Sequence, residues 1–158
     1  MRLSHHFDLR ELTRSDAAVR LGIDNTPPQA AVEALRALCV AVLEPVRLHF
    51  GRPLRVSSGY RCDEVNRAVG GNPKGSHPAG EAADFEVDDA SNLAVARWIA
   101  GSGLPFDQVI LEFHVPGDPH SGWVHASHRA AGDNRGEAWT MSRIGGRVVT
   151  ARGLPEPR

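Results

Sequence analysis

Residues 75–85 read GSHPAGEAADF, a stretch that joins a bend to a strand and carries two candidate metal ligands. His77 precedes Asp84 by seven residues, and Pro78 and Gly80 between them argue against a helix. We therefore expect His77 on a loop and Asp84 on the strand that follows, so that both side chains point at one place. Taken alone, the pair also fits a surface histidine and a turn aspartate.

A second histidine-bearing stretch, SGWVHASH at residues 121–128, is typical of a short strand. In a strand His125 and Trp123 share one face. A single inward histidine is usually a core residue, but His125 adds the third donor that His77 and Asp84 lack. Two histidines and one carboxylate leave zinc a fourth position for water, as in catalytic zinc sites. The three residues therefore predict a zinc site, and a structural histidine is the alternative.

A hydrolytic zinc site usually also needs a general base, and Glu112 is the candidate. It interrupts the apolar run VILEFH at residues 109–114 and shares a strand face with Ile110. An acid in such a place is often only an edge or solvent-facing residue. Beside a metal site, the same carboxylate would act as base and proton shuttle.

The remaining pattern alternates helical and strand signals and predicts an α+β fold. A long apolar helical face recurs from Val32 to Val46, with Thr26 as the expected N-cap and Pro45 as a kink or break. Asp88 or Asp89 is expected to cap a later helix. The helices are expected at residues 8–14, 15–22, 26–51, 63–71 and 88–103, and the strands within 53–61, 81–87, 106–115, 121–128 and a hairpin at 142–152.

Because the last strands follow one another without helices between them, we expect a small, mostly antiparallel sheet with helices packed on one side. The 158 residues favour one domain over residues 1–158, with a core from about 4 to 150 and a flexible tail at 151–158.

Composition excludes several classes of function. The formal net charge of −1 gives no reason to expect nucleic-acid binding, and no apolar run approaches the ~20 residues of a membrane helix. The N-terminal stretch lacks the apolar core of a secretory signal. Cys39 and Cys62 lie in no metal-ligand spacing and are expected to be buried or half-buried thiols, although the sequence does not exclude a disulfide. We expect a monomer.

Several separated stretches together resemble the zinc D-Ala-D-Ala carboxypeptidase family, which includes phage endolysins. They are SSGYR at 57–61, GSHPAGEAADF at 75–85 and WVHAS at 123–127, in that order. FDLRELTRSDAAVRLGIDNTPP, the long helix, VNRAVGG and DQVILEF are also similar to that family, so the resemblance spans roughly residues 4 to 128.

The resemblance implies zinc bound by His77, Asp84 and His125, and a substrate carboxylate bound by Arg61. A planar guanidinium with five donors suits that second role. The sequence departs from the family pattern at two places. The residue two before the first histidine is Gly75 instead of serine, and Gly122 stands three before the last histidine, where many members carry the acid.

Glu112 is the best substitute for that acid and resembles the strand glutamate of the related hedgehog-type zinc domain. His114, His120 and His128 lie near the site in the sequence, and one of them is a candidate donor to a developing oxyanion.

The resemblance implies a zinc peptidase that cleaves peptidoglycan stem peptides, either at D-Ala-D-Ala or at an internal bond such as L-Ala-D-Glu. Such a protein would be made in the cytoplasm and reach the wall after lysis or delivery, from a phage or a bacterium. Two alternatives stay open: a zinc-binding module without catalysis that binds wall peptides or a protein partner, and a metal-free globular protein.

Overall fold

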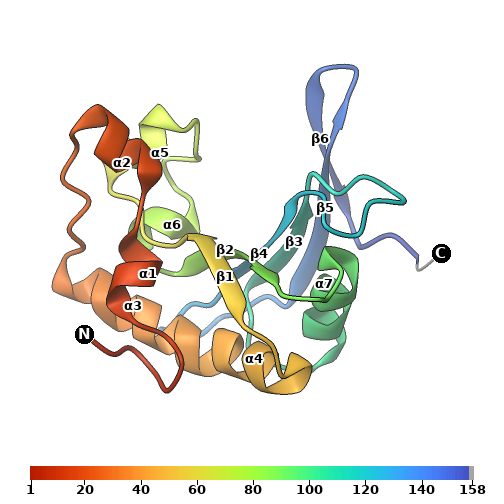
Figure 1. Cartoon of the computed structure of the whole chain (residues 1–158), viewed down its shortest axis with the longest axis horizontal. Helices are drawn as coiled ribbons and strands as arrows, with labels where there is room; N and C mark the ends of the chain where they lie inside the picture. Colours follow the sequence, from red (N-terminus) through yellow and green to blue (C-terminus); the bar gives the residue numbers. More distant parts are fainter. Residues whose placement is uncertain (157–158) are drawn as a thin grey trace.

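A six-stranded sheet forms the centre of the protein, with the strand order β1-β2-β4-β3-β5-β6 (Figure 1). The structure, a computed structural model, describes residues 1–156. Only β3 and β5 pair in parallel; the other neighbouring strands are antiparallel. The strands are β1 (Leu54–Ser58), β2 (Ala82–Val87), β3 (Gln108–Glu112), β4 (Trp123–Ser127), β5 (Glu137–Ile144) and β6 (Arg147–Arg152). The prediction of an α+β fold with a mostly antiparallel sheet is confirmed.

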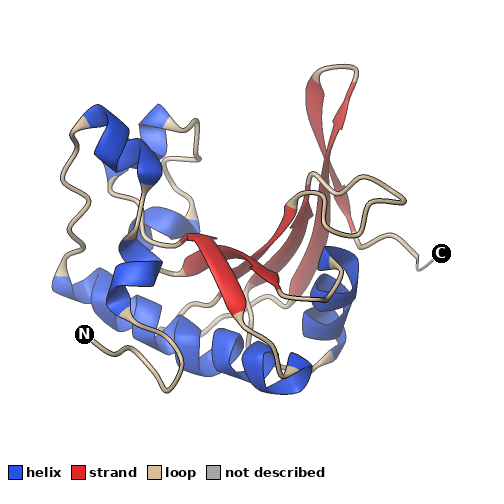
Figure 2. Cartoon of the chain, viewed as in Figure 1, coloured by secondary structure: helices blue, strands red, loops and turns tan. Residues whose placement is uncertain are grey.

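The helices that build the core pack against one face of this sheet (Figure 2). The apolar residues of the long helical segment and of α7 join those of β2, β3 and β4 in a single buried cluster. The helical elements are α1 (Leu9–Thr13), α2 (Asp16–Leu21), α3 (Gln29–Leu38), the π-helical η1 (Cys39–Leu43), α4 (Glu44–Phe50), α5 (Asp63–Ala68), α6 (Ser76–Ala79) and α7 (Asn92–Gly101). None of these described helices is long and apolar enough to cross a membrane.

The opposite face of the sheet is only partly covered. Along β3, the exposure alternates: Val109 and Leu111 are buried in the core, whereas Gln108, Ile110 and Glu112 are half-buried on the other side. That alternation is the period of two that a strand with one core face must have. Gln108, Ile110 and Glu112 therefore project from the face that the core helices do not cover.

Two predicted helix starts were wrong. The long helix begins at Gln29, because the hydroxyl and amide of Thr26 bond to Asp24 and so form a turn ahead of the helix. The cap of α7 is Ser91, whose hydroxyl accepts from the amide of Ala94. Asp88 and Asp89 fail as caps because Asp88 accepts from Arg55 and Asp89 has a left-handed backbone (φ 58°).

At Pro45, where a kink or break was expected, the helix continues from α3 into α4 without a gap, through the π-helical turn η1. In η1 the amide of Glu44 donates to the carbonyl of Cys39, so α4 restarts with Pro45 in its first turn. The wider π-helical turn directly before Pro45 accommodates the missing amide donor of the proline within a continuous helix.

The predicted loop around His77 is wrong. Residues Ser76–Ala79 form the single helical turn α6, which Gly80 ends with a left-handed backbone (φ 75°). Pro78 lies in the first turn, where its missing N–H is not needed. The turn is packed against α3 and β2, so it fixes the histidine more firmly than a loop would.

The hairpin predicted around Gly145 and Gly146 is confirmed. Both glycines have positive φ angles (56° and 79°), as a tight two-residue hairpin turn requires. The predicted tail at 151–158 includes residues 157–158, which lie outside the described residues. Within the described part, Leu154 packs against the core and the Pro155 carbonyl accepts from Arg97 at 2.7 Å.

Both cysteines are free thiols, as expected: Cys39 is buried and Cys62 is half-buried. Burial raises the pKa of the Cys39 thiol to about 12, so it is an inert core residue at neutral pH.

Candidate metal and catalytic site

Two neighbouring antiparallel strands and one helical turn bring the three candidate ligands together. Asp84 of β2 pairs directly with His125 of β4, so their side chains share one face of the sheet. His77 reaches the same place from α6, which immediately precedes β2. The sequence GSHPAGEAADF therefore supplies two ligands from one turn and the strand that follows it.

The three side chains form a buried cluster that can hold a metal ion, since one ligand atom from each lies within 4.8 Å of the others. Asp84 is at the centre: its Oδ1 is 2.8 Å from His125 Nδ1, and its Oδ2 is 3.3 Å from His77 Nε2. Only 6–8% of each residue is exposed.

The tautomer of His77 suits a metal ligand. Its Nδ1 donates to the carbonyl of Gly59 at 2.6 Å, which leaves the lone pair of Nε2 facing Asp84. A backbone carbonyl that holds the outer ring nitrogen is the usual outer partner of a metal-binding histidine. Two imidazoles and one carboxylate, with the ring orientation already fixed, fit zinc with one position left open.

The electrostatics of the cluster keep its aspartate charged. Burial raises the pKa of Asp84, but the two histidines lower it further, so the net pKa is below the usual range. Burial lowers the pKa of His77 and outweighs the attraction of Asp84. For His125, burial is outweighed by its hydrogen bond to Asp84, and the net pKa is raised.

Glu112 lies beside this cluster on the same face. Its Oε1 is 3.9 Å from His125 Nδ1, although the two residues are thirteen positions apart in the sequence. Burial and the charge of Asp84 raise the pKa of Glu112. A carboxylate with a raised pKa is a stronger base than an exposed glutamate.

Arg61 approaches the cluster from the side of β1. Its Nη2 is 3.8 Å from Asp84 Oδ2, and only 16% of the side chain is exposed. Its Nε is buried and has no hydrogen-bond partner among the described residues. Burial lowers the pKa of Arg61. The guanidinium thus retains an unused, desolvated donor next to the candidate metal ligands.

The structure gives a physical reason why the position three before His125, where the resemblance implied an acid, is Gly122. Gly122 has a positive φ (67°), and a Cβ there would lie 1.8 Å from the carbonyl oxygen of Glu112. No side chain can be placed there without moving the backbone of β3. Glu112 itself occupies the neighbouring strand and points its carboxylate toward His125.

Sequence reasoning missed two groups at this site. The carbonyl of Gly59 orients His77, and a backbone carbonyl has no signature in a sequence. Trp123 pairs across the strands with Glu112, and its buried indole N–H has no hydrogen-bond partner among the described residues. The strand alternation predicted that Trp123 shares a face with His125. Only the structure shows that its indole N–H has no partner among the described residues.

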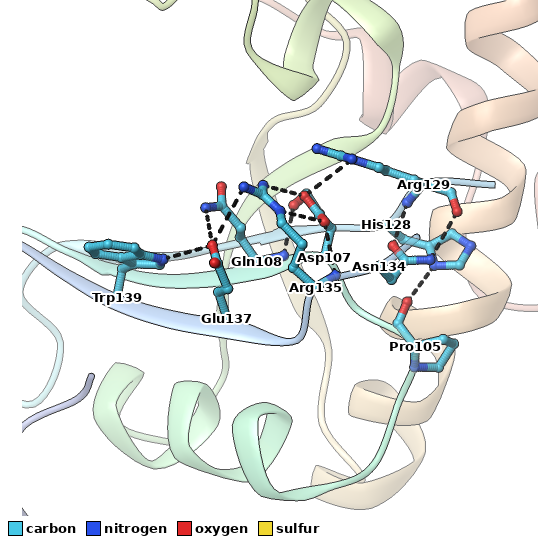
Figure 3. Close-up of polar contacts among 10 residues, drawn as sticks. Pro105, Asp107, Gln108, His128, Arg129, Asn134, Arg135, Glu137 and Trp139 are labelled. Carbon is cyan, nitrogen blue, oxygen red and sulfur yellow. Dashed lines mark hydrogen bonds and ion pairs between the residues drawn. The ribbon is translucent and has the colours of Figure 1, made fainter. Parts of the chain in front are cut away.

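The three other nearby histidines differ in what their rings do. His128 Nδ1 donates to the carbonyl of Pro105 at 2.6 Å, on the side of the sheet where α7 lies (Figure 3). His120 is exposed on the loop between β3 and β4. His114 has a buried Nδ1 without a hydrogen-bond partner among the described residues. Of the three, His114 alone keeps a desolvated ring nitrogen free, so the oxyanion prediction now rests on it.

Comparison with known families gives one result. Residues 5–127 match the family described as peptidase M15. The match contains α1 through β4, including every residue of the cluster described above, and ends before the β5–β6 hairpin. A search of curated proteins finds no match to the chain.

Proposed function

The chain belongs to the peptidase M15 family, and from this premise we propose that it is a zinc-dependent peptidase acting on the stem peptides of bacterial peptidoglycan. The observation that supports the proposal best is the buried His77, Asp84 and His125 cluster with a base and a cation beside it. The peptidoglycan substrate follows from the sequence resemblance described above.

In this proposal His77, Asp84 and His125 hold the zinc ion. When bound, zinc would offer an open position to a water molecule and lower the pKa of that water toward ~7. The ring nitrogens and carboxylate are already fixed by Gly59 and by each other, so little reorganisation is needed to bind the ion.

Glu112 is the proposed general base. Its carboxylate accepts the proton of the attacking water and passes it to the nitrogen of the leaving amine. Glu112 is largely buried, with 14% of its side chain exposed, so bulk water has little access to its carboxylate. Trp123 flanks it with a free indole N–H that can hold the carboxylate in place.

Arg61 is the proposed carboxylate anchor. It would pair with the C-terminal carboxylate of a D-Ala-D-Ala substrate, or with the D-Glu carboxylate if the cut is internal. The planar fork binds a carboxylate through two parallel hydrogen bonds, which fixes the direction of the peptide across the metal ligands.

The experiment combines product analysis with one variant. Zinc-loaded protein is incubated with defined muropeptides, and mass spectrometry of the products identifies the bond that is cut. Glu112→Gln keeps the shape of the side chain and removes the base, so it should retain zinc and lose turnover by ~10² or more.

A zinc-loaded Glu112→Gln protein with a wild-type rate would refute the role of Glu112. Muropeptides that bind to zinc-loaded wild type but remain uncut would favour the non-catalytic binding module instead.

A further inference from the structure

A continuous row of paired residues runs across the sheet from the metal ligands to the far edge. Asp84 pairs with His125, His125 with Ile110, Ile110 with Trp139, and Trp139 with Arg152. Directly paired residues of neighbouring strands project from the same face. Trp139 and Arg152 therefore lie on the face that carries the metal ligands, and both are outside the part of the chain that matches the family.

The indole of Trp139 is held in place by a chain of polar contacts (Figure 3). Its Nε1 donates to Glu137 Oε2 at 3.2 Å. The same oxygen accepts from Gln108 at 3.1 Å and lies 3.5 Å from Arg135 Nη1. Arg135 is in turn bound through two nitrogens to the buried carboxylate of Asp107. The ring therefore has its edge fixed before any ligand arrives.

The Arg152 guanidinium lies over this ring, 5.7 Å from its centroid. It has one weak ion pair, at 3.6 Å to Glu137 Oε1, and 72% of its side chain is exposed. Arg152 is thus a cation on an aromatic surface with most of its donors facing solvent. A fixed aromatic face beside an accessible guanidinium complements an aliphatic chain that ends in a carboxylate.

We propose that Trp139 and Arg152 form a distal subsite for a substrate residue whose aliphatic side chain ends in a carboxylate. The aliphatic stem lies on the indole of Trp139, and the carboxylate pairs with Arg152. The subsite deepens the proposed peptidase function and rests on it for its position along the substrate.

The position of the subsite indicates which part of the substrate it reads. Trp139 is two strands from His125, or about 10 Å at the usual strand spacing. Two extended residues cover about 7 Å of that distance, and a long side chain spans the rest, so the second residue before the cut bond can reach the subsite. Arg61 lies on the opposite side of the ligands, toward β1. If Arg61 holds the C-terminal side of the substrate, the subsite holds a residue N-terminal to the cut bond.

The test uses three synthetic peptides that end in D-Ala-D-Ala and differ only in the residue before that pair. Diaminopimelate and lysine share the aliphatic stem and its terminal ammonium, only diaminopimelate adds the carboxylate, and alanine has none of the three. We expect wild-type kcat/KM to rise from alanine to lysine to diaminopimelate. Because Arg152 is exposed, its contribution to the last step should be about fivefold.

Two variants divide this preference between the two side chains. Arg152→Gln should abolish the advantage of diaminopimelate over lysine and leave the alanine peptide unchanged. Trp139→Leu should reduce the advantage of both long side chains over alanine. Arg147→Gln is the matched control, since Arg147 is an exposed arginine of the same strand at the hairpin turn, and it should change none of the three values.

A second readout separates this proposal from the proposed function. The same peptides are titrated calorimetrically into zinc-loaded Glu112→Gln protein, alone and combined with Arg152→Gln. Preferential binding of diaminopimelate without turnover in the wild type would support the subsite and refute the peptidase. Cleavage with equal kcat/KM for all peptides, or an equal loss on all three in Arg152→Gln, would overturn the subsite and leave the peptidase intact. Neither binding nor cleavage would overturn both.

Discussion

Asp84 and Asp107 are both aspartates buried at the sheet, and both have pKa values below the usual range. Their partners differ. Asp107 is bound by permanent cations: Arg135 donates to both of its oxygens at 2.9 and 2.7 Å, and Arg129 lies 3.4 Å away. Asp84 faces two imidazoles and has its nearest guanidinium only at 3.8 Å.

The different partners give the two aspartates different capacities: Asp107 is suited to a structural role and Asp84 to binding a metal. An arginine has only donors and no lone pair with which to bind a metal. Its donors occupy the carboxylate oxygens of Asp107 in a permanent ion-pair network. Imidazole nitrogens can either donate a proton or bind a metal. The cluster around Asp84 can therefore exchange its internal hydrogen bonds for metal bonds, whereas the cluster around Asp107 braces the start of β3 and the indole of Trp139.

The largest expected effect comes from Asp84→Asn. The amide keeps the size of the side chain but removes the charge that would bind the metal, and metal stabilisation of a transition state is worth several kcal/mol. Peptidase turnover should fall by about 10³-fold or more. The measurement is kcat/KM on a defined muropeptide, with Asp107→Asn as the matched control. A control that loses as much activity as Asp84→Asn, while still folded, would erase the distinction between the two aspartates.

Asp107→Asn should instead cost stability. It replaces charge-assisted hydrogen bonds to Arg135 by weaker ones, and a loss of about 2 kcal/mol in the free energy of unfolding is expected at pH 7. Urea denaturation of the two variants measures this. If the Asp107→Asn protein is as stable as the wild type, the ion-pair network contributes nothing to the free energy of unfolding.

The stability difference between the wild type and Asp107→Asn should depend on pH. The hydrogen bonds from Arg135 lower the folded-state pKa of Asp107, and Arg129 adds to this, while Glu81 is the nearby acid. A depressed pKa contributes stability above the unfolded value of about 3.9, and that stability is lost as the pH falls through the folded-state pKa. The difference between wild type and Asp107→Asn should therefore be full at pH 7 and shrink below pH ~4. A difference that stays constant down to pH 2 would contradict the assignment.

The cluster around Asp84 could be predicted from the sequence because short spacings and strand alternation determine it. The network around Asp107 could not. His77, Asp84 and His125 were identified correctly as a cluster because alternation in two strands and one short spacing determine their faces. The Asp107 network was not identified, since Arg129 and Arg135 reach it from a connection whose path no local pattern specifies. The sequence also could not show that β5 would pair in parallel with β3, which places Trp139 in line with His125.

The errors of prediction have the same origin. Pro78 excludes the interior of a helix but not its first turn, so α6 was missed. Asp88 is a good cap by residue type, but a tertiary contact with Arg55 uses its carboxylate, and the cap passes to Ser91.

A smaller effect is expected from Arg61→Lys. Lysine keeps the charge but cannot pair with a carboxylate through a planar fork, so kcat/KM should fall about tenfold, the loss of one charged hydrogen bond. Amidating the substrate carboxylate that Arg61 binds should lower the wild-type value by a similar factor and have little further effect in the variant. Equal cleavage of free and amidated peptides by the wild type would refute the role of Arg61.

The central claim is that Asp84 belongs to a zinc site and Asp107 does not, and the metal content of purified protein tests it most directly. Elemental analysis should find about one zinc per chain in the wild type and in Asp107→Asn, on the three-ligand arrangement. It should find close to none in Asp84→Asn at the same free zinc concentration. A wild-type protein without zinc, or an Asp84→Asn protein that keeps a full equivalent, would contradict the account.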